Sequence, residues 1–222
     1  MDVAPGNETD KSNRRTTCLF GFSVSGDLRF ISHHDTLRLF SRALARACLP
    51  VRFSEGFNPH PRISIPLPRP VGVASDVEAL VVEFDGQIDP NAVLRRLSEQ
   101  MPAGIRIISV KTLKNGEKPE ARLVRYRISL ESDAPPELVQ SVKRVLEADE
   151  LVVNRKTAAN GSARAIDIRP YLAELRAEGA ELEFAINVTA TGAARPAEVA
   201  GLLGFDAVSI NHRIRRTEVQ WH

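Results

Sequence analysis

Cysteine is scarce in this 222-residue chain, where only Cys18 and Cys48 occur. Neither a CxxC nor a CxxxCxxC spacing is present, so the chain lacks the thiolate patterns of zinc and iron–sulfur sites. His33 and His34 are adjacent rather than four residues apart, which is not the spacing of a helical metal site. We therefore expect no metal site and no cofactor in this chain, and two reduced cysteines packed in the core.

Aromatic residues and long apolar runs are also few. Aromatics make up 5% of the chain, and no strand carries the aromatic motif of an RRM domain. The glycines form neither a GxGxxG nor a P-loop pattern, so nucleotide hydrolysis is not indicated. No apolar segment is long enough to span a membrane, and residues 1–15 are polar rather than a signal peptide. These observations favour a cytoplasmic protein without membrane association.

Neither sign of charge dominates, because 30 Lys and Arg face 28 Asp and Glu, which gives a net charge of +2. The positive charge is nevertheless concentrated in residues 26–69, which contain seven arginines and three acidic residues. A local arginine excess of this kind favours an anionic partner.

Within that stretch, Ser32 and Asp35 match a capping box, in which a carboxylate follows the cap residue by three positions. Asp35 therefore has two readings, as a structural cap together with Ser32 or as a general base or nucleophile. The helix that begins here has an apolar face and, on its opposite side, an arginine stripe made of Arg38, Arg42 and Arg46.

The sequence Gly56-Phe57-Asn58-Pro59-His60-Pro61-Arg62 follows that helix. Its two prolines remove backbone donors and bias the residues before them toward extended conformations, which predicts a rigid loop. Phe57 and Asn58 are suited to stacking on and hydrogen bonding with unpaired bases, and Arg62 to contacting phosphate. His60 has two readings, as a general acid or base and as an anchor of the loop.

The alternation of apolar residues predicts strands at 17–24, 28–31, 51–54, 63–67, 78–84 and 105–113, with helices beginning at 32 and 89. The second half repeats this order, with strands at 123–130, 151–155, 181–189 and 208–219 and helices beginning at 135 and 196. We therefore predict an α+β fold of two tandem ferredoxin-like (split βαβ) units with antiparallel sheets, an internal structural duplication. The expected organisation is a disordered leader (1–15), a first unit (16–113), a linker (114–120) and a second unit (121–222).

Each predicted unit carries a basic insert after its second strand, and the second insert includes Asp167, for which an ion pair with Arg169 and a catalytic role both stay open. Taken together, the two halves offer these candidate nucleic-acid contacts: Arg38, Arg42, Arg46, Phe57, Asn58, Arg62, Arg69, Lys156, Arg164 and Arg169.

The motif around Asp27 and Asp35 and the GFNPHPR string resemble the bacterial radical SAM-linked protein family, a domain of unknown function. The strings Asp167-Ile168-Arg169-Pro170 and Arg195-Pro196-x-Glu198-Val199 resemble second-half motifs of the same family, and His34 departs from its common leucine. The resemblance implies a partner, since such domains are fused to or encoded beside radical SAM enzymes. This chain lacks the CxxxCxxC motif, so it cannot bind that cluster itself, and the resemblance implies the separate accessory half, with an activity of its own left open.

Three functions stay open at this point. The first is an accessory domain that binds tRNA or another structured RNA and works with a radical SAM modification enzyme. The second is an RNA-modifying or RNA-cleaving enzyme that uses Asp35 and His60. The third is a pure protein-interaction module of a radical SAM enzyme.

Overall fold

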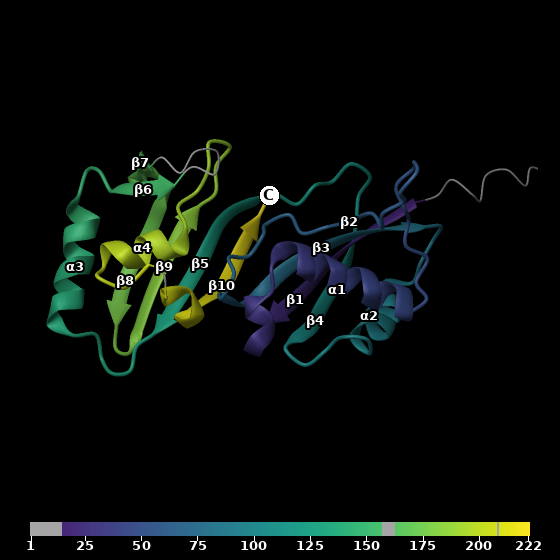
Figure 1. The fold of residues 1–222 in the computed structure, drawn as a ribbon, viewed down its shortest axis with the longest axis horizontal. Coiled ribbons are helices and arrows are strands. Elements are labelled where there is room, and N and C mark those ends of the chain that lie inside the picture. Colours follow the sequence, from purple (N-terminus) through teal and green to yellow (C-terminus); the bar gives the residue numbers. More distant parts are fainter. Residues whose placement is uncertain (1–14, 157–162, 208) are drawn as a thin grey trace, which may run out of the picture. The chain divides into compact units, whose positions relative to one another are not determined.

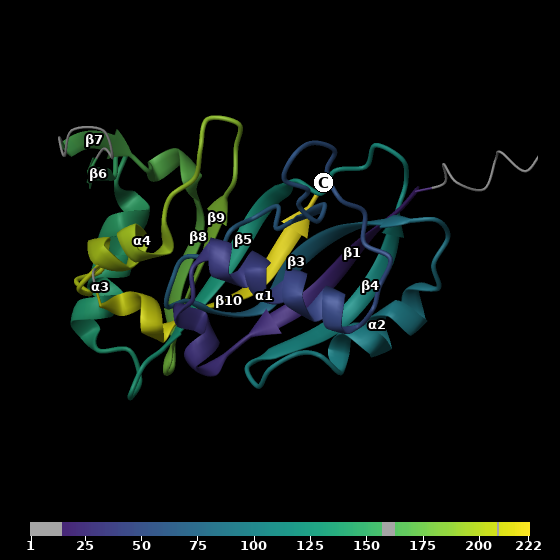
Figure 2. The same ribbon diagram turned by 45° about the vertical axis from the view of Figure 1, so that its right-hand side comes forward.

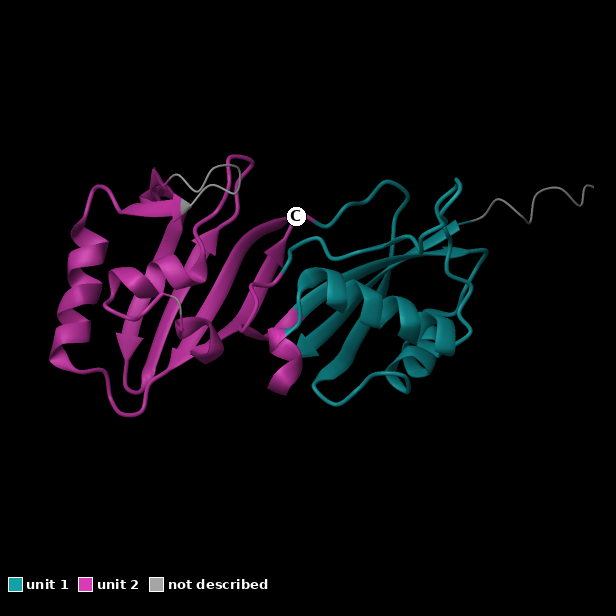
Figure 3. Ribbon diagram, viewed as in Figure 1, with its two compact units in different colours: residues 1–24, 31–68, 78–119 teal, residues 25–30, 69–77, 120–222 magenta. Residues whose placement is uncertain are grey.

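The computed structural model describes residues 15–156, 163–207 and 209–222, so nearly all of the predicted leader (1–15) lies outside the described residues. The chain forms two compact units (Figure 3). Unit 1 contains residues up to 24 together with 31–68 and 78–119, and unit 2 contains 25–30, 69–77 and 120–222. Two short segments, 25–30 and 69–77, therefore belong to unit 2 although they lie in the first half of the sequence.

The predicted α+β class is confirmed: the described residues contain four α-helices, one mixed eight-stranded sheet and a separate two-stranded hairpin (Figure 1). The expectation of purely antiparallel sheets is wrong. Strand β3 (Ala74–Asp85) begins four residues before the predicted strand, and its first residues pair in parallel with β10 (Ile214–Trp221). Apolar alternation revealed only the part of β3 that lies in unit 1.

Unit 1 consists of β1 (Arg15–Val24), α1 (His33–Arg46), β2 (Ile63–Ser64), the larger part of β3, α2 (Pro90–Ser98) and β4 (Ile105–Leu113). Its strands follow the order β4-β1-β3-β2, with antiparallel β1–β4 and β2–β3 pairs. Helices α1 and α2 lie on one face of these strands (Figure 2). On that face the rings of Phe22 and Phe40 pack edge to face, with 4.8 Å between their centroids. Among the described residues of unit 1, no helix lies on the other face of the sheet.

Unit 2 consists of η1 (Gly26–Phe30), β5 (Ala121–Ser129), α3 (Pro136–Glu147), β6 (Val152–Lys156), β7 (Ala163–Asp167), η2 (Arg169–Tyr171), β8 (Leu172–Glu178), β9 (Glu181–Asn187), α4 (Pro196–Leu202), η3 (Ile210–Arg213) and β10. The strand order is β10-β5-β9-β8, all antiparallel, and β6 and β7 form the separate hairpin. Buried Tyr126 and Phe184 stack at 5.5 Å in the core of this unit.

Several predicted elements differ from the structure. The strand predicted at 28–31 is wrong, because residues 26–30 form the 3₁₀ helix η1, which contains no buried residue. Strand β8 was not predicted, since its bulge between Leu172 and Glu174 places both Leu172 and Leu175 in the core and breaks the two-residue period. Cys18 is buried as expected, but Cys48 is exposed.

None of the helices in the described ranges combines the length and the apolar character needed to cross a membrane.

Candidate nucleic-acid interface

The start of α1 is a complete capping arrangement. The Ser32 hydroxyl accepts a hydrogen bond from the Asp35 amide at 3.1 Å and donates one to Asp35 Oδ2 at 2.6 Å. Arg38 Nη1 lies 3.3 Å from Asp35 Oδ1. The Ser32 hydrogen bond and then the Arg38 charge lower the pKa of Asp35 below its ordinary value of 3.8. A carboxylate held in its ionised form as a helix cap is a poor general base, so the geometry favours the capping role.

The arginine stripe of α1 is only partly available. Arg38 is engaged with Asp35, and Arg46 donates to the Gln100 carbonyl at 2.8 Å. Arg42 is exposed, and no side-chain partner contacts it among residues 15–156, 163–207 and 209–222. One of the three predicted contacts in the stripe is therefore open to a ligand without exchange of an existing bond.

The GFNPHPR sequence forms the tip of a hairpin that we call the 52–62 hairpin. The Arg62 amide donates to the Arg52 carbonyl at 2.8 Å, and the Ser54 amide donates to the His60 carbonyl at 2.8 Å. The Ser54 hydroxyl also accepts from the His60 amide at 3.0 Å. These bonds close the hairpin next to its tip, and the rigidity expected from the two prolines stays a prediction.

The tip of this hairpin presents side chains to solvent. The relative exposure of Phe57 is 105%, so its ring makes no packing contact that shields it, and Asn58 and His60 are exposed beside it. Burying an aromatic ring is normally favourable, and a fully exposed ring on a rigid support is therefore available for a partner. The structure thus brings Phe57, Asn58, His60 and Arg62 together on one hairpin.

The two predicted catalytic residues are not joined. No hydrogen bond or ion pair links Asp35 to His60 in the described part of the chain. The backbone of His60 bonds Ser54 across the hairpin, whereas its imidazole makes no hydrogen bond within the described residues, so both interpretations of its side chain stay predictions. Burial and then the neighbouring His34 lower the pKa of His33, so its imidazole is harder to protonate than a free one.

Two of the predicted RNA-contacting arginines have their guanidinium groups occupied by backbone carbonyls. Arg69 Nη1 donates to the Arg29 carbonyl at 2.7 Å. Arg169 Nε donates to the Ala148 carbonyl at 3.0 Å, and its Nη2 donates to the Leu146 carbonyl at 3.4 Å. Both side chains tie loops to neighbouring elements within unit 2.

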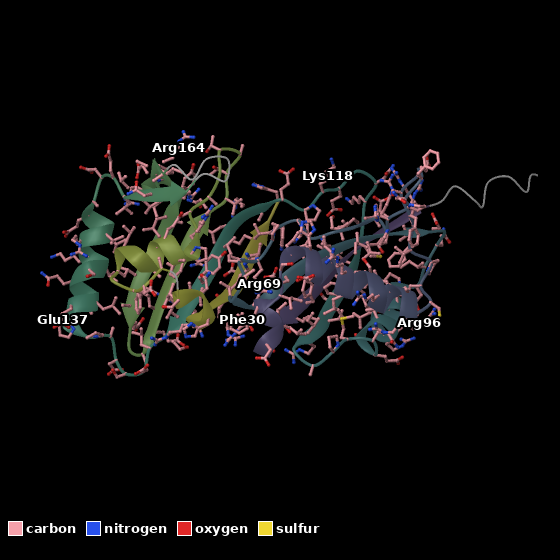
Figure 4. The ribbon with its side chains drawn as sticks, viewed as in Figure 1. Phe30, Arg69, Arg96, Lys118, Glu137 and Arg164 are labelled. Atoms are coloured by element: carbon pink, nitrogen blue, oxygen red, sulfur yellow. The ribbon has the colours of Figure 1, made fainter. Side chains whose placement is uncertain are left out.

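The second insert is dominated by backbone hydrogen bonds. Asp167 accepts from the Leu151 amide at 2.8 Å and from the Arg169 amide at 2.9 Å, and these two bonds lower its pKa. Its predicted pairing with the Arg169 side chain is thus replaced by a backbone bond. Arg164 is exposed on β7 (Figure 4), whereas the side chain of Lys156 lies outside the described residues.

One ion pair escaped the sequence analysis. Arg155 binds Glu198 through two contacts of 2.7 Å each, and Glu198 also accepts from the Arg195 amide at 2.8 Å. The side chains of Arg155 and Glu198 are 19% and 13% exposed, and the hydrogen bonds that Arg155 donates to Glu198 raise the pKa of Arg155. The motif Arg195-Pro196-x-Glu198 was the available signal, because a glutamate three residues after a helix start can cap it.

Neither the cavity of unit 2 nor any group of metal-ligating side chains coincides with the predicted site residues in the described part of the chain. A hollow of about 540 Å³ lies in unit 2 beside Leu138 and Leu203, away from every predicted site residue. Within the residues that the structure describes, no three His, Cys, Asp or Glu side chains are grouped as metal ligands.

Residues 18–196 match the family described as "Uncharacterized protein conserved in bacteria (DUF2344)". The chain belongs to this family. No curated protein matches it. Among solved structures, an unknown protein from Galdieria sulphuraria is similar over 94% of this chain and 98% of its own, with 11% sequence identity and a TM-score of 0.30.

Proposed function

We propose that this member of the family binds RNA through the 52–62 hairpin and acts as the accessory partner of a radical SAM modification enzyme. The observation that carries the RNA-binding part is the fully exposed ring of Phe57 on a hairpin closed by backbone bonds. A rigid support lowers the entropic cost of binding, because the loop need not become ordered when RNA arrives.

The chemistry around Phe57 supports RNA as the ligand. An exposed ring can stack on any unpaired base, and Asn58 offers both a donor and an acceptor for a base edge. Arg62 lies 4.0 Å from Glu83, which is a loose pair that a phosphate group can replace. The family resemblance of the GFNPHPR string supports the radical SAM partner. We propose tRNA or another structured RNA as the ligand.

We also propose that the two units are related as an internal duplication of a ferredoxin-like unit. When the separate β6–β7 hairpin is left out, the four sheet strands of each unit, numbered by their order along that unit, follow the arrangement fourth, first, third, second. Each unit also contributes two helices after its first and third strands. This arrangement is that expected for a split βαβ unit.

Fluorescence anisotropy with labelled tRNA across a salt series tests the RNA-binding proposal. We expect affinity that falls with salt, and a loss of about 5- to 150-fold in Phe57→Ala, the range for one base–aromatic stack. Phe30→Ala is the matched control, because Phe30 is 50% exposed but lies in unit 2. Equal losses in both variants, or no binding at low salt, would refute the proposal.

The two other functions are outcomes of related measurements. Turnover of RNA by the purified chain that disappears in Asp35→Asn would favour an enzyme. Stable association with a radical SAM enzyme in the absence of any RNA affinity would favour a protein-interaction module.

A further inference from the structure

The side from which the 52–62 hairpin presents its arginines follows from strand alternation. Val51 bridges Phe84, and Ile63 pairs with Val82, so all four residues point toward the helices of unit 1. Phe84 and Val82 are fully buried there. Residues 52 and 62 alternate with this set and therefore point to the opposite, helix-free face of the sheet.

The ion pair between Arg62 and Glu83 agrees with that assignment. Glu83 alternates with buried Val82 and Phe84 on β3, so its carboxylate also lies on the helix-free face. Arg52, whose amide donates to the Glu83 carbonyl at 2.8 Å, flanks the same residue. The hairpin thus contributes two guanidinium groups to one face of unit 1.

The same face continues across β1 and β4. Cross-strand partners share a face, and the pairs on this side are Leu19 with Lys111, Gly21 with Ser109, and Ser23 with Arg106. Arg106, Ser109 and Lys111 are exposed. The face therefore has arginines at the hairpin end and Arg106 and Lys111 on β4, and the β1 residues between them include the small Gly21 and Ser23.

The arginine stripe of α1 lies on the other layer. Phe40, Ala43 and Leu44 are buried against the strands, so Arg38, Arg42 and Arg46 lie on the outer surface of the helical layer. One RNA strand cannot cover both layers and still contact the hairpin by a short path. The number of unpaired arginines favours the helix-free face over the helical layer, because Arg38 and Arg46 already have partners within unit 1.

We infer that an unpaired RNA strand lies on the helix-free face of unit 1, from the 52–62 hairpin across β1 to Arg106 and Lys111 on β4. This inference rests on the proposed function and adds the class of RNA and its path. Small residues let flat bases approach the strands, and arginines at both ends neutralise phosphates. Lys111 pairs with Glu117 at 3.4 Å in an exposed contact, which a phosphate can replace.

Neutralising one arginine on each layer tests the path. Arg106→Gln and Arg95→Gln remove the same charge from exposed positions of unit 1, one on β4 and the other on helix α2. Binding of an unstructured RNA of about 12 nucleotides is measured by anisotropy at several salt concentrations. We expect the salt slope of the logarithm of affinity to fall by about 0.7 in Arg106→Gln, the value for one single-strand phosphate contact, and to stay unchanged in Arg95→Gln.

Other outcomes separate this inference from the proposed function. If Phe57→Ala weakens binding but Arg106→Gln does not, the path is wrong and the hairpin proposal stands. The same conclusion follows if Phe57→Ala weakens binding and Arg42→Gln weakens it as much as Arg106→Gln does. Equal affinity for a duplex of the same sequence overturns the unpaired class alone. Absence of binding by every RNA overturns both proposals. Circular dichroism melting of each variant checks that the fold is intact.

Discussion

The open sheet faces of the two units both carry arginines, but the state of these arginines differs. In unit 2, Arg125 binds Glu174 and Glu218, and Arg127 and Arg176 both bind Glu183. In unit 1, Arg52 and Arg106 contact no side-chain partner within the described ranges, and Arg62 is only loosely paired. A guanidinium group bridged between carboxylates adds little field for a phosphate, so the number of arginines alone does not identify a binding face.

The largest expected effect concerns the ion pair of Arg155 and Glu198, whose side chains are only 19% and 13% exposed. Glu198→Gln should lower the free energy of unfolding by about 3 kcal/mol, because it leaves the charge of Arg155 largely buried without its partner. Urea unfolding at pH 7 measures the change. Glu174→Gln is the control on the exposed sheet face, and it should cost less than about 1 kcal/mol.

A loss of similar size in both glutamate variants would contradict the distinction between enclosed and exposed pairs. RNA affinity should be unchanged in both, because neither glutamate belongs to unit 1.

Arg169→Ala should have the second largest effect. Its guanidinium bonds the carbonyls of Leu146, Ala148 and Leu172, and leaving these acceptors unpaired should cost about 2 kcal/mol. Arg164→Ala is the matched control, since the exposed Arg164 should cost less than about 0.5 kcal/mol. Thermal unfolding of both variants measures the difference. An unaltered midpoint in Arg169→Ala would return this arginine to the candidate RNA contacts.

Local signals in the sequence predicted the beginnings of the helices well. Ser32 and Asp35 form the cap that their spacing indicated, and Asp89 accepts from the Asn91 amide at 2.9 Å at the start of α2. These interactions join residues two or three positions apart, so no knowledge of the tertiary fold is needed to find them. The GFNPHPR sequence was recognisable as a loop for the same reason, because its prolines act on neighbouring residues.

Features that depend on distant residues were not predictable. The parallel pairing of Arg215 with Ala74 joins segments that are remote in the sequence, and two carbonyl acceptors of Arg69, those of Leu28 and Arg29, come from η1. The sequence offers no basis for treating Arg69 and Arg62 differently, because only the fold shows that Arg69 is bonded to carbonyls whereas Arg62 is loosely paired. The sequence could thus predict the GFNPHPR loop of the candidate interface, but not which face of the sheet its arginines lie on.

Ser32→Ala tests the local cap and should cost about 1 kcal/mol at pH 7. Because the Ser32 hydrogen bond is the main cause of the lowered pKa of Asp35, its stabilisation is present above the ordinary value of 3.8 and is lost as pH falls below it. The difference in stability between the wild type and the variant should therefore narrow below pH 3.8. Chemical denaturation at a series of pH values measures it, and a constant difference would argue against the ionised cap.

The smallest effect on stability is expected for a pair of arginines that represents the two open faces. Arg176→Gln and Arg52→Gln should each change the free energy of unfolding by less than about 0.5 kcal/mol, since both side chains make exposed or no ion pairs. Their effects on RNA binding should nevertheless diverge. Arg52→Gln should lower the salt slope by about 0.7, whereas Arg176→Gln should leave it unchanged, because Glu183 already neutralises that charge. If both variants lowered the slope equally, bonded arginines would count as fully as free ones, and the contrast between the two faces would be lost.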